Sequence, residues 1–490
     1  MFAQTTSVAM VGVEARPVRI EVHVSRVKEA FTLVGLPDTS VREAKDRVRA
    51  AIVSSGHDFP RRRVTVNLSP ADLPKAGTDY DLPIALGVLA AAGNVAAGLR
   101  VVAAGELSLD GTVRRTRTAI GAGLLSARKG WPCLVAERDA SIATRVPGAV
   151  VYPVASLAEA AAVLAGTQPP RPAAPADEDA VADSAFDLAE VRGQPLARRA
   201  LEIAAAGGHH LLMVGPPGSG KTMLARRLTS ILPPLTDAEA VEVACLWAAA
   251  GRHRPFSHQP PFRAPHHSAS MAAVVGGGLI HPSPGEVSLA HRGMLFLDEL
   301  GEFPPHLLNA LRQPLEEGRV TIARRGSTVT FPAESQVVAA SNPCPCGFRG
   351  DRLRTCRCSA STLERYGRRL SGPFLDRFDL RIEVPTVESL ALLGGPSEDS
   401  ATVHRRVIAA RAIQTERGIR NGRIGRPNLD KQPVSAAGRD LLVHAIQVGM
   451  LTARGVDRVR RVARTIADLA GQDAIAEDHI AEAIAFRVDI

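Results

Sequence analysis

The stretch GPPGSGKT, from Gly215 to Thr222, decides the fold of much of this 490-residue chain. It fits the pattern G-x-x-x-x-G-K-[ST], follows the strand-like run HLLMV and precedes the helix-like run MLARRLTSIL. In that setting the glycines let backbone N–H groups surround a phosphate, the lysine reaches the β- and γ-phosphates, and the hydroxyl meets Mg²⁺. A chance match in a glycine-rich turn is the alternative, and the flanking strand and helix argue against it. The predicted ligands of ATP and Mg²⁺ are Gly215, Pro216, Pro217, Gly218, Ser219, Gly220, Lys221, Thr222 and Met223.

A second apolar strand, in GMLFLDEL, ends in Asp298 and Glu299. Because parallel strands of one sheet end at the same edge, these carboxylates are expected beside the glycine-rich loop. Asp298 would then hold Mg²⁺ through water, and Glu299 would orient and polarise the attacking water. An apolar strand that ends in Asp-Glu is uninformative alone, but after a phosphate-binding loop it indicates ATP hydrolysis.

A third strand, SQVVAAS, is followed by Asn342, which could contact the γ-phosphate or the water, the position called sensor 1 in AAA+ ATPases. In GPFLDRFDL, Arg377 is a candidate arginine finger supplied to a neighbouring subunit, a role that contributes about 10³–10⁵ in rate. The alternative for Arg377 is an ordinary ion pair with Asp376 or Asp379.

The segment TARG places Arg454 at the start of a C-terminal helix. This position suits sensor 2, the lid arginine that touches the γ-phosphate, and Arg458, one turn further on, is the alternative.

One change in composition and the pattern of strand-like and helix-like runs divide the chain into four parts. Residues 1–165 alternate short strand-like runs with Ala-rich helical ones, which predicts an α/β domain. Residues 166–186 include the Pro-, Ala- and acid-rich run GTQPPRPAAPADEDA and read as a linker. Residues 187–386 again alternate strands and helices, as an α/β ATPase core does. Residues 387–490 carry apolar residues at helical spacing and predict a helical lid.

Charge and hydropathy restrict the cellular setting. The formal net charge is +9, which favours a nucleic acid or another polyanion as partner, although a solvated basic surface gives the same count. The start shows no secretory signal, and the most apolar run, residues 84–98, is interrupted by glycine and too short to span a membrane. We therefore expect a cytoplasmic protein without a membrane partner, in which thiols stay reduced.

Four of the six cysteines lie in one segment, SNPCPCGFRGDRLRTCRCS. Four thiolates in a reducing compartment suit tetrahedral Zn²⁺, although the C-x-C spacing is tighter than usual in zinc sites. A redox pair and an unliganded loop are the alternatives. We expect a structural clip between sensor 1 and the arginine finger, with the zinc ligands Cys344, Cys346, Cys356 and Cys358.

Together these motifs resemble the AAA+ branch that contains the magnesium-chelatase ATPase subunit and MCM helicases. The segment PFRAPHHSASMAAVVGGGLIHPSPGEVSLAHRG looks like the helix-2 insert of that branch, and GRVTIARRGSTVTFP looks like its hairpin. The resemblance implies that the hairpin tip, with Arg324 and Arg325, contacts DNA, and a solvated basic turn is the alternative. Adjacent histidines in a loop are usually not a metal pair, so His266 and His267 have no assigned role.

A nearer resemblance, over nearly the whole chain, is to the ComM/YifB family of magnesium-chelatase-like ATPases. It rests on VGLPDTSVREAKDRVRAAI, NLSPADLPKAGTDYDLPIALG, GELSLDG, FRAPHHSAS, NPCPCG, RLSGPFLDRFDL and ARTIADL. It implies a homohexameric ring that hydrolyses ATP and drives branch migration of recombination intermediates, in natural transformation or in recombination generally. The alternative is a magnesium-chelatase-type subunit that drives metal insertion through a partner.

The first domain also resembles the proteolytic domain of Lon, a ribosomal protein S5 domain 2-like α/β fold. In PKAGTDYDLP the position of Lon's nucleophilic serine is Asp79, and Ile120 stands at the position of its lysine. An aspartate cannot replace the alkoxide, so we expect the fold without the protease, and Thr78 as substitute nucleophile is the alternative. The domain is then expected to help build the ring or to grip DNA.

Overall fold

The computed structural model describes residues 1–35, 38–71, 73, 75, 77–173, 186–252, 254–278, 282–324, 327–351, 354–369, 372–387, 395 and 397–488. It divides the chain into two compact units. The first unit comprises Met1–Asp179 with Thr236–His258, and the second comprises Ala180–Leu235 with Gln259–Ile490.

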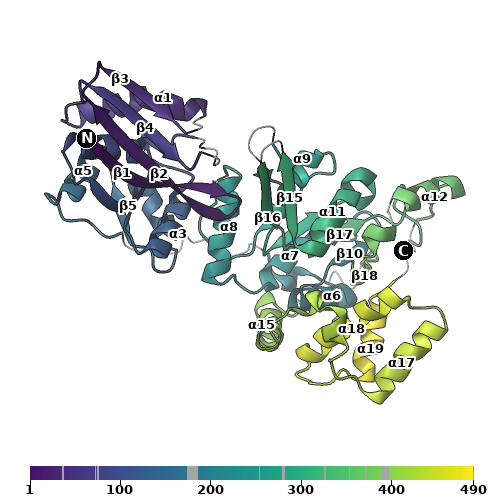
Figure 1. Ribbon diagram of the computed structural model, residues 1–490. Coiled ribbons are helices and arrows are strands. Elements are labelled where there is room, and N and C mark those ends of the chain that lie inside the picture. The colour runs from purple at the N-terminus through teal and green to yellow at the C-terminus, as the bar shows by residue number, and fades with distance from the viewer. Residues whose placement is uncertain are drawn as a thin grey trace. The chain divides into compact units, whose positions relative to one another are not determined.

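The first unit is built on a seven-stranded sheet of order β3-β4-β2-β1-β5-β8-β9 (Figure 1). β1 pairs with β2, and β2 with β4, antiparallel, while the other pairs are parallel. A two-stranded ribbon of β6 and β7 lies apart from it. The strands are β1 Phe2–Val11, β2 Glu14–Ser25, β3 Ala30–Val34, β4 Arg63–Ser69, β5 Gly98–Ala104, β6 Glu106–Leu107, β7 Val113–Arg114, β8 Cys133–Ala136 and β9 Val151–Val154.

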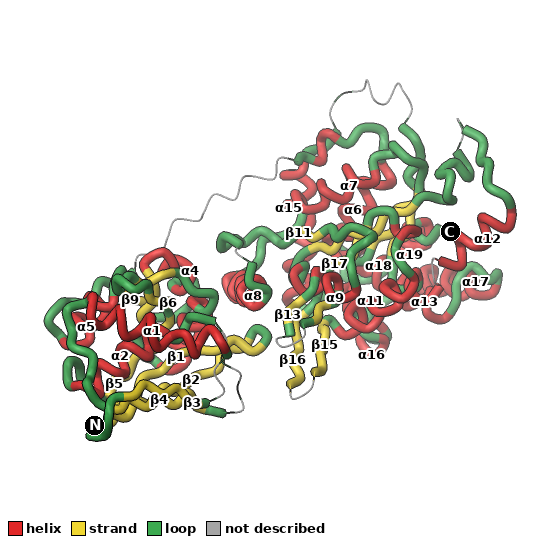
Figure 2. Tube along the Cα trace, turned by 90° about the horizontal axis from the view of Figure 1, so that it is seen from above, coloured by secondary structure: helices red, strands yellow, loops and turns green. Residues whose placement is uncertain are grey.

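Helices cover both faces of this sheet, because alternate residues of its inner strands are apolar on both sides. Ala103 packs in the core under α1, α2 and α5, whereas Val102 and Ala104 pack in the core with α3 and α4. Figure 2 shows α1, α2 and α5 together over one face. The helices are α1 Thr39–Ser54, α2 Asp81–Ala92, α3 Ala119–Lys129, α4 Ala140–Ala143 and α5 Leu157–Ala165.

One helix of the first unit comes from a distant part of the sequence. α8, Asp237–Ala249, follows the phosphate-binding helix in the chain, yet it packs on the first unit. Its Val241, Ala244 and Cys245 share an apolar cluster with Ile120 of α3 and with Val146. The segment thus lies inside residues 187–386, the expected ATPase core, but contributes to the core of the first unit.

The second unit contains a parallel five-stranded sheet of order β11-β14-β17-β10-β18. β10, β14 and β17 are buried along their whole length, as expected for a parallel sheet with both faces covered. The strands are β10 Leu211–Val214, β11 Phe262–Arg263, β14 Met294–Leu297, β17 Gln336–Ser341 and β18 Leu380–Glu383.

Helices and two short ribbons surround this sheet. The C-terminal helices share one apolar core with it, in which Val459 and Ile466 of α18 belong with Leu201 of α6. The predicted α/β class with a helical C-terminal lid is confirmed. The elements are α6 Pro195–Gly207, α7 Lys221–Leu228, α9 Met271–Val274, β12 Gly276–Gly277, β13 Ser283–Pro284, α10 Glu286–Leu289, α11 Pro305–Glu317, β15 Arg319–Arg324, β16 Ser327–Pro332, α12 Ala360–Arg369, α13 Gly372–Leu375, α15 Ser400–Glu416, α16 Arg426–Leu429, α17 Ala436–Gln447, α18 Ala453–Leu469 and α19 Glu477–Ala485.

Within the described ranges, the helices are too short or too polar to cross a membrane.

Candidate functional site

The glycine-rich loop joins β10 to α7 at the carboxyl edge of the parallel sheet. Gly218 and Gly220 have φ values of +83° and +90°, which favour glycine, and a Cβ on Gly215 would lie 2.1 Å from the Val384 carbonyl oxygen. α7 has no side-chain cap, so the N–H groups of its first turn point into the loop region without a side-chain acceptor. This is the backbone arrangement that binds phosphate groups.

Lys221 begins α7 and bends back over the loop. Its ammonium donates to the carbonyl oxygens of Gly215 and Pro216, at 2.7 and 2.8 Å, and lies 3.4 Å from Oδ1 of Asn342. Burial lowers the pKa of Lys221, and the nearby charge of Asp298 opposes that shift. The ammonium therefore lies between the loop and the tip of β17, where a γ-phosphate would meet both.

Thr222 and Asp298 meet at the magnesium position. The Thr222 hydroxyl donates to Oδ2 of Asp298 over 2.8 Å, which joins the first turn of α7 to the end of β14. A hydroxyl and a carboxylate side by side are the protein ligands that Mg²⁺ takes in such sites, alongside waters and substrate phosphates. The residues present therefore fit the expected cation.

Glu299 is held in an unusual backbone conformation. Its φ is +53°, in the left-handed region that residues with a Cβ rarely adopt, and its N–H donates to Oδ1 of Asp298 at 3.0 Å. Non-glycine residues in this region cost roughly 1–3 kcal/mol and cluster at functional sites. The Glu299 side chain is 59% exposed.

A histidine that the sequence left without a role lies against this glutamate. Nδ1 of His267 is 3.3 Å from Oε2 of Glu299. The ring lies against that of His266, with centroids 4.0 Å apart and the two planes tilted by 34°, and it meets Phe303 edge-on at 6.4 Å. The segment of His267 follows β11, the strand next to β14, so the shared carboxyl edge of the sheet was the signal that could have paired it with Glu299.

Asn342 follows β17 and completes the group at this edge. Besides its contact with Lys221, its backbone carbonyl accepts a hydrogen bond from the Tyr366 hydroxyl at 3.1 Å. The structure thus brings together Lys221, Thr222, Asp298 and Asn342, as expected from the order of the apolar strands.

Arg377 forms an ion pair with Glu316 of α11, and its guanidinium also donates to the Pro373 carbonyl at 3.0 Å. The neighbouring acids have other partners: Asp376 lies 3.5 Å from Arg381, and Asp379 binds His209 at 2.9 Å. The ion pair that the sequence offered as an alternative is therefore present with a different acid, and the finger role stays a prediction.

The two candidates for sensor 2 differ in exposure. Arg454 lies exposed in the first turn of α18. Arg458 is largely buried 3.8 Å from Asp379, and burial lowers its pKa. The choice of Arg454 remains a prediction, favoured by its open position.

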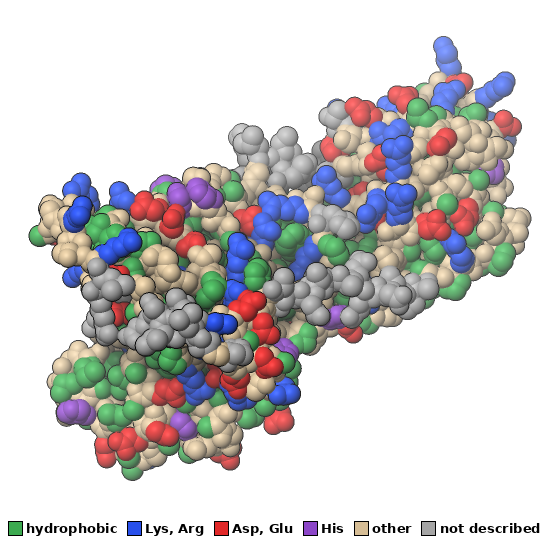
Figure 3. All heavy atoms as spheres, turned by 180° about the vertical axis from the view of Figure 1, so that it is seen from behind, with side chains coloured by type: hydrophobic (Ala, Val, Ile, Leu, Met, Phe, Trp, Pro, Cys, Tyr) green, Lys and Arg blue, Asp and Glu red, His purple; other side chains and the backbone are tan. Residues whose placement is uncertain are grey.

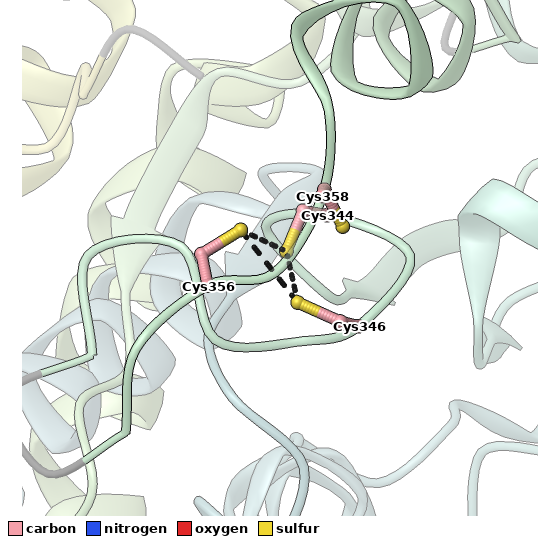
Figure 4. A group of neighbouring side chains, drawn as sticks. All are labelled: Cys344, Cys346, Cys356 and Cys358. Carbon is pink, nitrogen blue, oxygen red and sulfur yellow. Dashed lines mark hydrogen bonds between the residues drawn. The ribbon is translucent and has the colours of Figure 1, made fainter.

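The four clustered cysteines converge (Figure 4). Cys344 lies 3.4 Å from Cys346 and 3.7 Å from Cys356, Cys346 lies 3.6 Å from Cys356, and the four sulfurs lie within 4.8 Å of one another. Zn–S bonds of about 2.3 Å place the corners of a tetrahedron about 3.8 Å apart, close to these distances. Backbone N–H groups of Phe348 and Arg357 lower the pKa of Cys346 to about 6, whereas the pKa values of the neighbouring Cys356 and Cys358 are raised, so Cys346 is the first of these three thiols to ionise.

The predicted hairpin is present as β15 and β16, paired from Arg319–Pro332 to Arg324–Ser327. The hairpin has buried apolar side chains on both strands, those of Val320, Ile322 and Phe331. The Arg324 side chain and all of Arg325, the predicted DNA contacts, lie outside the described residues.

The segment for which the sequence resemblance predicted the loss of a Lon-type nucleophile contains a buried carboxyl. Asp79 is buried and accepts a hydrogen bond from the Thr116 hydroxyl at 2.5 Å, and burial raises the pKa of Asp79 to about 6. The Thr78 hydroxyl donates to Glu106, while Ile120 packs in an apolar cluster. The buried Lys75 in the same segment donates to the Pro70 carbonyl.

Comparison with known proteins places these features in one family. Three family models match the chain. The model for magnesium chelatase subunit ChlI matches residues 187–392, a second model for subunit ChlI of Mg-chelatase matches residues 20–138, and the model for the C-terminal part of ChlI matches residues 397–487. The Competence protein ComM of Haemophilus influenzae is 45% identical over 98% of this chain and 96% of its own. An uncharacterized protein YifB of Salmonella typhimurium is 44% identical over the same shares, and a magnesium-chelatase 38 kDa subunit of Rhodobacter capsulatus is 25% identical over 60% of this chain and 84% of its own. The chain belongs to the ComM/YifB family of magnesium-chelatase-like AAA+ ATPases.

Proposed function

We propose that this protein is a cytoplasmic, homohexameric, ATP-driven DNA motor that moves the branch point of recombination intermediates. The observation that carries the proposal is the position of the β15–β16 hairpin. In the chain, Glu299 is followed by a short 3₁₀ turn, Leu300–Glu302, then by α11, then directly by β15. One helix therefore joins the residue that would activate water to the element that would touch DNA.

In this proposal, the residues that bind and hydrolyse ATP follow different strands at the carboxyl edge of the parallel sheet. Lys221 and the N–H groups of α7 hold the phosphates, Thr222 and Asp298 hold Mg²⁺, and Glu299 orients the attacking water. Mg²⁺ supplies charge neutralisation on the β- and γ-phosphates when bound. Asn342 and Lys221, 3.4 Å apart, would both respond to the loss of the γ-phosphate.

In a ring, each subunit would receive an arginine finger from its neighbour. Arg377 would serve as finger for the neighbouring subunit, which requires it to leave Glu316 of α11. Because α11 also leads into β15, exchange of Arg377 between Glu316 and a neighbour's nucleotide would link hydrolysis in one subunit to the hairpin of the next. Arg454 would contact the nucleotide from the lid.

The partner in this proposal is branched or single-stranded DNA. A relative that shares 45% identity across 98% of this chain bears the name competence protein, which associates that relative with natural transformation. The tip arginines Arg324 and Arg325 would contact phosphates as the hairpins move.

In the same proposal the four cysteines hold a structural Zn²⁺ that braces the site. The loop between Cys346 and Cys356 includes Gly347, where a Cβ would lie 2.5 Å from Cδ of Pro217 in the phosphate-binding loop. Zinc would fix this loop between Asn342 and α12. Elemental analysis of protein purified without chelator should give one zinc per chain, and Cys346→Ser should remove it while Cys245→Ala keeps it. Wild-type protein without zinc would exclude this role.

The experiment for the motor measures ATP hydrolysis with no DNA, with duplex and with a four-way junction, together with migration of a labelled junction. We expect stimulation by the junction and ATP-dependent migration, both abolished in Lys221→Ala and Glu299→Gln. Absence of stimulation and of migration in an assembled ring would contradict the proposal.

A second candidate is a magnesium-chelatase-type motor that drives metal insertion into a porphyrin through a partner subunit. The three ChlI models that match the chain favour it. Porphyrin metallation by this chain with candidate partners, without any effect of DNA on its ATPase rate, would favour this candidate over the DNA motor.

A further inference from the structure

One end of the seven-stranded sheet in the first unit carries five basic side chains, here called the basic cluster: Arg26, Lys28, Arg61, Arg62 and Arg63. All five are exposed. They come from two segments, the loop between β2 and β3 and the residues that lead into β4.

The register of the sheet brings these two segments together. β4 lies between β2 and β3, and Arg63 is opposite both Ser25 at the end of β2 and Ala30 at the start of β3. The loop from β2 to β3 therefore crosses the start of β4, and the N–H of Arg63 donates to the Val27 carbonyl at 3.2 Å. With strands about 4.8 Å apart, the basic cluster spans roughly 10 Å.

Charge in this place is left uncompensated. Among the described residues, no carboxylate lies within ion-pair distance of the basic cluster. Elsewhere in the described part of the unit, Arg16 and Arg47 have acidic partners, whereas the isolated Arg100 and Arg138 do not. The same segments contain two acidic residues, Glu29 and Asp58. Glu29 is paired with Arg49 at 2.7 Å, so its charge is already compensated outside the basic cluster. Figure 3 shows one face of the molecule, on which basic side chains gather in some places and are interspersed with acidic ones in others.

The positive charge and width of the basic cluster fit the phosphate backbone of duplex DNA. Duplex DNA carries one negative charge per about 1.7 Å of axis, so a surface some 10 Å wide faces several phosphates at once. Phe59, the aromatic ring of these segments, is buried with the Arg49 guanidinium over it at 5.2 Å. Among the described residues of these segments, the exposed groups of the basic cluster are therefore guanidinium and ammonium groups and not a Phe, Tyr or Trp ring, and such groups contact the phosphate backbone.

We infer that the basic cluster is a second DNA-binding surface, which holds the phosphate backbone of duplex arms without reading their sequence. The inference rests on the proposed DNA function and gives the Lon-like unit a role in it. While the hairpins engage the strands that move, the basic cluster would keep an arm of the substrate close to the ring.

The test compares two triple variants of the full-length protein with equal changes in charge. The cluster variant carries Lys28→Gln, Arg61→Gln and Arg62→Gln. The control carries Arg16→Gln, Arg100→Gln and Arg138→Gln, all exposed positions of the same unit. Affinity for a duplex and for a four-way junction is measured across a salt series, and ATPase rate is measured with and without DNA.

We expect the cluster variant to lose about 10- to 100-fold in affinity near 0.1 M salt, with a log–log salt slope smaller by about 3. The control should keep the wild-type slope, and both should keep the DNA-free ATPase rate. An unchanged slope in the cluster variant, with DNA-stimulated ATPase intact, would overturn this inference and leave the motor standing. The expected loss of slope without any stimulation of wild-type ATPase by DNA would support the DNA surface and contradict the motor.

Discussion

At the scale of single residues, the proposed catalytic glutamate lies in a strained turn. Glu299 has a φ of +53°, and its carboxylate meets His267 at 3.3 Å. A side chain that is 59% exposed has several rotamers available, so its neighbour limits where the carboxylate can point. We therefore expect His267 to be a positioning residue, which would act on the attacking water only through Glu299.

We expect His267→Ala to lower kcat for ATP hydrolysis by about tenfold, equivalent to about 1.4 kcal/mol, with KM for ATP near the wild-type value. His267→Gln, which can still donate to the carboxylate, should recover part of the rate. His266→Ala is the matched control, since His266 binds Ser268 at 2.7 Å and not Glu299. Equal effects of the two alanine variants would contradict a specific role of His267.

A second residue-scale prediction concerns Asp79, whose pKa burial raises to about 6. A carboxyl in an unfolded chain has a pKa near 3.9, so the folded state binds the proton more tightly. The first unit should therefore lose about 2–3 kcal/mol of stability as the pH rises from about 4 to about 6, and remain level above.

Asp79→Asn should remove this pH dependence and stabilise the first unit at pH 8 by about 1–3 kcal/mol, because the amide oxygen can still accept from Thr116. Tryptophan fluorescence in urea is the measurement, since the chain's two tryptophans, Trp131 and Trp247, both belong to the first unit. Asp46→Asn, exposed on α1, is the control. A pH profile of Asp79→Asn identical to wild type would refute the assignment.

At the scale of elements, the cysteine loop and the phosphate-binding loop touch at Gly347. Its φ is +85°, and a Cβ there would lie 2.5 Å from Cδ of Pro217, whereas Gly350 has a φ of +77° and open space around it. Alanine at either position meets the same backbone strain, roughly 1 kcal/mol. Only alanine at Gly347 also displaces Pro217.

Gly347→Ala should therefore raise KM for ATP several-fold more than Gly350→Ala, with zinc content equal in the two variants. Steady-state kinetics and elemental analysis on matched preparations give both quantities. Equal KM values would show that the cysteine loop does not brace the nucleotide site.

The elements also show how far the sequence could lead. β10, β14 and β17 were predictable because buried parallel strands are continuous apolar runs, and their shared edge placed Lys221 and Asp298 together. The packing of α8 on the first unit was not predictable. An apolar helix face such as that of Val241 and Cys245 indicates burial but does not indicate which surface covers it. The contact of His267 with Glu299 joins two loops distant in sequence, which local patterns do not encode.

At the scale of the whole molecule, the two units are joined more than once along the chain. It passes from the first unit to the second through the linker, returns with α8, and leaves again after His258. Removal of residues 1–186 would leave Val241, Ala244 and Cys245 of α8 without their partners Ile120 and Val146.

We expect the fragment 187–490 to aggregate, and the same fragment with Val241→Lys and Ala244→Glu to remain dispersed, because the changes remove the orphaned apolar face. Light scattering after purification reports the difference. The same two changes in the full-length chain should destabilise the first unit, which urea unfolding detects by tryptophan fluorescence. Equal solubility of the two fragments would mean that α8 does not depend on the first unit.

The threading of α8 also bears on how such a protein can evolve. A domain that begins and ends at a linker can be gained, lost or exchanged by a single recombination event between genes. Here, an exchange at residues 166–186 would replace the first domain but keep α8. The new domain would then have to pack against a helix whose apolar face fits the original domain. The first unit and the ATPase part of this chain are therefore expected to be inherited as a pair, with substitutions on α3 and α8 accumulating together.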